Sequence, residues 1–129
     1  MTQARPVPVE LVVRGDRAGV QATLEEFFLG RGWRLRERGD DRLDVERGSR
    51  RRTVFLGALA GKAFYLTARI EIRAGEHATV LRYRGDAGAG AALGGILGRH
   101  RAARAHQETA AALAGRFESE GRMVQVRRG

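Results

Sequence analysis

The stretch Gly85-Asp-Ala-Gly-Ala-Gly-Ala-Ala-Leu-Gly-Gly-Ile-Leu-Gly98 separates a strand-like segment from a long, alanine-rich segment with helical periodicity. Most of its side chains are a hydrogen atom or a methyl group, so its backbone can turn or approach a neighbouring element closely. An earlier stretch, Leu56-Gly-Ala-Leu-Ala-Gly-Lys62, has the same character. The chain therefore divides into a strand-rich part before Gly85 and a helical part after it.

The part before Gly85 alternates in polarity with a period of two, which is typical of strands. This pattern predicts strands at 7–14, 33–38, 42–47, 53–56, 63–73 and 78–84. After the first strand, Asp16 can cap a helix whose apolar residues recur at helical spacing; they are Val20, Leu24, Phe27 and Phe28. Short turns join the strands from residue 33 onward, so we expect them to form an antiparallel meander.

The part after Gly85 is expected to begin as a loop and to become helical near Ile96, because each glycine inside a helix costs about 1 kcal/mol relative to alanine. The helix then runs to about Ser119, and Gly121 ends it. Its predicted inner face consists of Ala103, His106 or Gln107, Ala110, Leu113 and Phe117. Residues 123–128 can pair as a final strand.

The element order is β-α-β-β-β-β-β-α, and residues 1–129 are expected to form a single domain. The predicted fold class is α+β: a two-layer sandwich in which a long C-terminal helix packs across an antiparallel meander sheet of about six strands. In element order this arrangement is similar to the helix-grip fold. A TBP-like or cystatin-like arrangement of sheet and helix stays open as the alternative.

The hairpin at 33–47 allows its register to be predicted. If Arg38 lies opposite Arg42, then Arg36 faces Asp44, Arg34 faces Glu46 and Leu35 faces Val45. Opposite charges on neighbouring strands contribute roughly 0.2–1 kcal/mol each. The arginines of this hairpin are therefore expected to be neutralised at a solvated sheet face, and not to form a nucleic-acid contact.

The composition limits the class of protein. The chain has a net charge of +9, carried almost wholly by arginine, and no cysteine, so disulfides and thiolate metal sites are excluded. Its first residues lack the apolar core of a signal peptide. No apolar run reaches the ~18–20 residues that a membrane span needs. We therefore expect a cytoplasmic protein without a transmembrane segment.

Residues that would support catalysis are few. The three histidines, His77, His100 and His106, lack the spacing of a metal site. Neither serine lies in a nucleophile-elbow context. The sequence therefore predicts no catalytic residues, no metal, no cofactor and no enzymatic activity. For His106 it favours a core histidine that is hydrogen-bonded to the sheet.

Two candidate contact surfaces remain. The two glycine-rich stretches are predicted to meet at one end of the sheet as an apolar rim formed by Leu59, Lys62, Leu93, Ile96 and Leu97. If this rim is exposed, it would be a binding site. If it is buried, it would only close the end of the sheet. The densest basic segment consists of Arg50, Arg51 and Arg52 and is suited to an anionic partner.

The sequence thus supports two functions. The first is a non-enzymatic binding module that holds an apolar or amphipathic anionic small molecule between the sheet and the C-terminal helix. The alternative is an interaction or assembly protein that docks to a protein partner, an anionic membrane surface or nucleic acid through the rim and the basic end. A homodimer is compatible with both.

Overall fold

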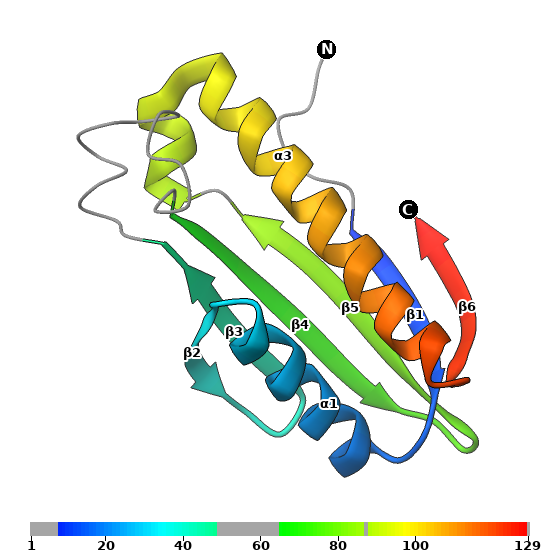
Figure 1. Cartoon of the computed structure of the whole chain (residues 1–129). Helices are drawn as coiled ribbons and strands as arrows, with labels where there is room; N and C mark the ends of the chain where they lie inside the picture. The colour runs from blue at the N-terminus through cyan, green and yellow to red at the C-terminus, as the bar shows by residue number, and fades with distance from the viewer. Residues whose placement is uncertain (1–7, 49–64, 87, 129) are drawn as a thin grey trace.

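In a computed structural model, residues 8–48, 65–86 and 88–128 are described, with side chains for all of these except 88–98 and 128 (Figure 1). This part of the chain contains two helices, α1 (Arg17–Gly30) and α3 (Gly88–Ser119). Its strands are β1 (Val9–Arg14), β2 (Arg34–Arg38), β3 (Arg42–Arg47), β4 (Leu66–Ala74), β5 (Ala78–Asp86) and β6 (Met123–Arg128). The predicted strand at 53–56 lies outside the described residues. Neither helix is both long enough and apolar enough to cross a membrane within the described residues.

The strands form one antiparallel sheet in the order β2-β3-β4-β5-β1-β6. β2 to β5 follow one another as an antiparallel meander, but β3 pairs directly with β4, whereas the predicted meander placed the strand at 53–56 between them. β1 is added beside β5, and β6 pairs with β1 at the edge, which confirms the predicted final strand. Both helices cover the same face of the sheet, and α3 lies diagonally across it (Figure 1). The α+β sandwich with a C-terminal helix across the sheet is therefore confirmed.

The core lies between this sheet face and the two helices. Every second residue of β1, β3, β4 and β5 points into it, as the period-two pattern predicts. The α1 residues Val20, Leu24, Phe27 and Phe28 are buried as predicted, and the Asp16 carboxylate accepts a hydrogen bond from the Gly19 backbone N–H at 2.8 Å. From α3, the buried apolar side chains are Ala102, Ala110, Leu113 and Phe117.

The register of the β2–β3 hairpin was predicted correctly only in part. Leu35 pairs with Val45 and Arg34 with Glu46, but a bulge at Arg36 places Glu37 opposite Asp44. The extra residue in β2 shifts the pairing by one, so the predicted Arg36–Asp44 pair is wrong. Arg36 contacts Glu46 instead, with 3.6 Å between Nε and Oε1. The arginines of β2 therefore do have carboxylate partners, with a different pairing.

The start of α3 differs from the prediction. The helix begins at Gly88, directly after β5, and not near Ile96. Alanines alternate with the glycines here and the segment has no proline, so helix can extend backwards from the packed residues 99–119 at a low cost per residue. Figure 1 shows that the first part of α3 runs in a different direction from the rest of the helix.

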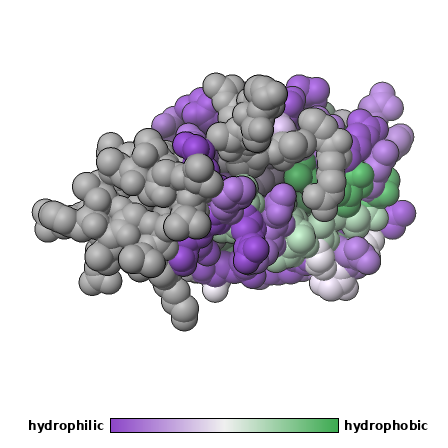
Figure 2. All heavy atoms as spheres, turned by 90° about the horizontal axis from the view of Figure 1, so that it is seen from above, coloured by the Kyte–Doolittle hydropathy of each residue, from purple (hydrophilic) through white to green (hydrophobic). Residues whose placement is uncertain are grey.

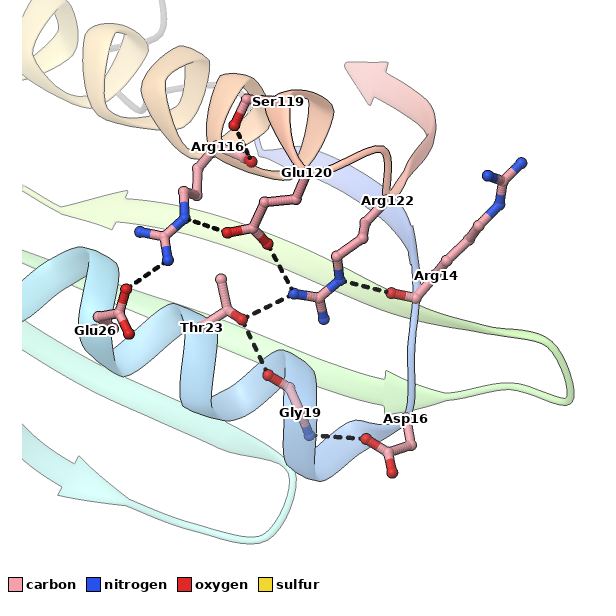
Figure 3. A network of polar contacts seen from close by, with 9 residues as sticks. All are labelled: Arg14, Asp16, Gly19, Thr23, Glu26, Arg116, Ser119, Glu120 and Arg122. Atoms are coloured by element: carbon pink, nitrogen blue, oxygen red, sulfur yellow. Dashed lines mark hydrogen bonds and ion pairs between the residues drawn. The ribbon is translucent and has the colours of Figure 1, made fainter.

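Arg122 joins three elements at one end of the domain (Figure 3). Its Nε donates to the Arg14 carbonyl oxygen at 3.1 Å, and its Nη1 donates to Thr23 of α1 at 2.9 Å and to Glu120 at 3.0 Å. Its guanidinium also lies 5.1 Å from the centre of the Phe117 ring. Nearby, Arg116 connects Glu120 to Glu26 of α1.

We predict that Arg122→Ala lowers the free energy of unfolding by about 1–3 kcal/mol, because it removes several hydrogen bonds from a mostly covered guanidinium. Urea unfolding followed by circular dichroism measures the change. Arg73→Ala on the solvated face of β4 is the control and should stay within about 0.5 kcal/mol of the unmodified chain. Equal losses in both variants would contradict this role of Arg122.

Candidate functional site

The structure does not describe the contact surfaces predicted from the sequence. Arg50, Arg51, Arg52, Leu59 and Lys62 lie outside the described residues. Leu93, Ile96 and Leu97 belong to α3, but their side chains are not among those described. The apolar rim and the basic segment therefore stay predictions. What the structure does describe is a polar cluster on the inner face of the sheet, under α3.

This cluster contains residues from four parts of the chain. Tyr83 comes from β5, His106 from α3, Trp33 from the residue before β2, and Arg47 from the end of β3. Tyr83, His106 and Trp33 are at most 3% exposed, whereas Arg47 is half-buried. Their rings adjoin: the His106 ring centre lies 5.8 Å from that of Tyr83 and 6.4 Å from that of Trp33.

His106 is hydrogen-bonded to the sheet through both ring nitrogens. Its Nε2 lies 3.1 Å from the Asp86 carbonyl oxygen, and its Nδ1 lies 2.7 Å from the Tyr83 hydroxyl. A carbonyl oxygen can only accept, so Nε2 carries the proton and Nδ1 accepts the hydrogen bond from Tyr83. The expectation that His106 is a core histidine bonded to the sheet is confirmed.

Gly85 makes the space that the imidazole occupies. A Cβ atom at Gly85 would lie 2.2 Å from Cγ of His106, far inside contact distance. The absence of a side chain thus lets the ring lie directly on the backbone of β5. The glycine therefore fixes how closely α3 approaches the sheet.

Burial keeps both hydrogen-bonded groups neutral. Loss of solvent lowers the pKa of His106 below its usual 6.5, because the charged imidazolium is disfavoured in the interior. Loss of solvent also raises the pKa of the Tyr83 hydroxyl above its ordinary value of 10. At neutral pH the pair is therefore an uncharged donor and acceptor.

Arg47 and Trp33 present donors that no described residue satisfies. The Arg47 guanidinium lies 5.5 Å from the centre of the Trp33 ring. Trp33 Nε1 and Arg47 Nε are both buried without a hydrogen-bond partner in the described structure. Burial, followed by the positive charge of Arg31, lowers the pKa of Arg47. The arrangement therefore favours an acceptor, above all an anionic one, beside these two groups.

The same residues do not suggest a metal centre. Within the described ranges, no group of three or more histidine, aspartate or glutamate side chains is placed to hold a metal ion. The buried polar atoms are mainly N–H donors, which bind oxygen acceptors and not cations. The N–H groups of the cluster are therefore suited to an oxygen acceptor.

Sequence reasoning missed Trp33, Arg47 and Tyr83 as site residues. A signal was present for the last two: Arg47 follows Leu43 and Val45 at the inward positions of β3, and Tyr83 follows Leu81 in β5. A charged or hydroxyl-bearing residue in a row of inward apolar ones indicates a functional or hydrogen-bonded interior group.

Comparison with known proteins adds no further indication, since no family model, curated protein or solved structure matches this chain.

We predict that Gly85→Ala lowers the free energy of unfolding by about 1–3 kcal/mol, because the new methyl group overlaps the His106 ring. His106→Ala alone is also destabilising, since it removes the buried hydrogen bond of the ring with the Tyr83 hydroxyl and its bond with the Asp86 carbonyl. The double variant should be more stable than the sum of the two losses predicts, by at least about 0.5 kcal/mol. Strictly additive losses in chemical unfolding would contradict the contact.

We predict that the domain loses stability between pH 7 and pH 5. The pKa of His106 is lower in the folded chain than in the unfolded chain, so the unfolded chain binds a proton first as the pH falls below about 6.5. The loss is at most about 1.4 kcal/mol per pH unit for one group. His106→Gln should flatten the dependence of the melting temperature on pH in this range, and an unchanged dependence would count against the assignment.

Proposed function

We propose that the protein is a cytoplasmic, non-enzymatic binding module for an amphipathic anionic ligand held between the sheet and α3. The anionic group of the ligand contacts Arg47 and Trp33 Nε1, and its apolar part packs against the neighbouring aromatic rings. The observation that carries the proposal is the pair of buried donors, Trp33 Nε1 and Arg47 Nε, which have no acceptor in the described structure.

The energetic cost of these donors supports a ligand. A buried N–H without an acceptor costs about 1–3 kcal/mol, and more when the group is charged. Native structures keep few such groups, and a bound molecule or ion is one of their ordinary explanations. A carboxylate here would accept from both donors and offset the positive charges of Arg31 and Arg47, whose proximity lowers the pKa of Arg47.

The surroundings support an apolar component. Phe28 lies 5.4 Å from Trp33 and 6.4 Å from Tyr83, measured between ring centres. Binding sites for small molecules are usually lined by apolar and aromatic side chains, with a few polar groups that fix the orientation of the ligand. This combination is found beside Arg47. The alternative function, docking through the rim and the basic segment, rests on residues that the structure does not describe.

The proposal can be tested through Trp33, which is the single tryptophan of the chain. Its fluorescence reports directly on the candidate site. We predict that decanoate changes the emission of Trp33 in a saturable manner and that decanol, which lacks the charge, binds at least about tenfold more weakly. This difference corresponds to one charge-assisted hydrogen bond of about 1.5–3 kcal/mol.

The variant Arg47→Gln keeps a polar side chain but removes the charge, so it should bring the affinity for decanoate down to that for decanol. Arg73→Gln is the matched control, because it removes the same charge from an exposed position of β4 on the opposite face of the sheet. The melting temperature of each variant verifies that it is folded. Absence of any saturable change, or equal losses in both variants, would refute the proposed site.

A further inference from the structure

Two further arginines accompany Arg47 at the proposed site. Arg31 follows the last residue of α1, and Arg101 belongs to α3. Figure 1 shows α1 and β3 ending toward the upper left of the view, the side on which α3 begins. Arg101 lies on the flank of α3 that faces α1, because at 100° per residue it is about 60° from Arg116, which contacts Glu26 of α1. The three arginines therefore come from three elements that meet at one end of the domain.

These arginines are close enough to act on one another. After burial, the positive charge of Arg31 and, more weakly, that of Arg101 lower the pKa of Arg47. The Glu108 carboxylate acts in the opposite direction, and its effect is weaker than that of either arginine. Three arginines and one carboxylate leave an excess of two positive charges around Arg47. Figure 2 views this end of the domain from above and shows a hydrophilic area near its centre.

The carboxylates of the chain leave Arg31 and Arg47 without an ion pair. All fifteen aspartate and glutamate side chains belong to the described residues. None of the ion pairs among these residues includes Arg31 or Arg47. Their guanidiniums lie against aromatic rings instead, 5.4 Å from the centre of Phe27 and 5.5 Å from that of Trp33. The positive charge is therefore left for a bound anion to balance.

The donors at the site suit a group with several oxygens. Trp33 Nε1 and Arg47 Nε are buried and have no acceptor in the described structure, and the side chains of Arg31 and Arg101 are exposed beside them. A phosphate monoester offers three acceptor oxygens and a charge of about −1.5 to −2 at neutral pH. A carboxylate offers two oxygens and a single charge. Guanidinium groups also bind phosphate oxygens through two parallel hydrogen bonds. Phosphate therefore matches both the donors and the excess charge better than a carboxylate does.

We infer that the ligand is a phosphate monoester of a lipid or of another apolar molecule. Trp33 Nε1 and Arg47 Nε donate hydrogen bonds to the phosphate oxygens, and Arg31 and Arg101 balance its second negative charge. The inference rests on the proposed function, because it assigns the chemistry of the anionic group at the same site. An acid with one charge would use the same two buried donors but would leave one positive charge unbalanced.

The test compares two ligands with the same apolar chain and the same number of terminal oxygens. At about pH 8 decyl phosphate is mostly a dianion, because the second pKa of a phosphate monoester is about 6. Decyl sulfate has a single negative charge. Measured by the fluorescence of Trp33 in the unmodified chain, decyl phosphate should bind at least about tenfold more tightly than decyl sulfate. Inorganic phosphate has the charge without the apolar part, so it should bind at least about tenfold more weakly than decyl phosphate.

Two variants locate the second charge. Arg31→Gln and Arg101→Gln each remove one charge from an exposed side chain, so each should keep the fold and lower the preference for decyl phosphate over decyl sulfate about threefold. Arg84→Gln is the matched control, because it removes the same charge from an exposed position of β5 on the opposite face of the sheet. This control should keep the full preference. The melting temperature of each variant verifies that it is folded.

The outcomes separate this inference from the proposed function. Saturable binding of decyl phosphate and decyl sulfate with equal affinity overturns the inference and leaves the proposed function intact, because the site then accepts any amphipathic anion. A preference that is unchanged in both Arg31→Gln and Arg101→Gln overturns it as well. Equal affinities for inorganic phosphate and decyl phosphate exclude an apolar part of the ligand and so overturn the inference together with the proposed function. Absence of saturable binding of decyl phosphate, decyl sulfate and decanoate refutes both.

Discussion

The contact between the His106 ring and the bare backbone of Gly85 fixes the distance between α3 and the sheet. The imidazole is bonded at Nδ1 to Tyr83 and at Nε2 to the Asp86 carbonyl, so two points of β5 hold one residue of the helix. The bond to Tyr83 is buried and the bond to Asp86 is partly buried, which makes the loss of the first especially costly. The middle of α3 is therefore held at a fixed distance from the sheet. The buried Trp33 ring lies beside His106, and the half-buried Arg47 lies next to Trp33.

Several of the described arginines form ion pairs within the domain. Carboxylate partners accompany those of the hairpin and of the C-terminal region. Exposed pairs of this kind contribute about 0–1 kcal/mol each, so they neutralise the surface more than they stabilise it. Arg47 differs, because it lies on the inner face and its partly covered guanidinium meets an aromatic ring and not a carboxylate.

Periodicity predicted most of the fold. The alternation of apolar and polar residues predicted the strands and the inward residues of β1, β4 and β5. The helical spacing of apolar residues predicted the buried face of α1. Both patterns arise because one side of each element is buried. Periodicity failed where the structure depends on a neighbouring element. The bulge at Arg36 depends on how β2 pairs with β3. The start of α3 at Gly88 depends on the rest of the helix, which outweighs the low helix propensity of glycine. The cluster around Arg47 joins residues distant in sequence, so only His106 was recognised in advance.

We propose that the inner face beside Arg47 holds an amphipathic acid, and native mass spectrometry of freshly purified protein can test this binding. We expect an added mass that is released on denaturation as a small organic acid and that is lost in Arg47→Gln. A native mass equal to that of the bare chain, both as purified and after incubation with excess decanoate, would contradict it.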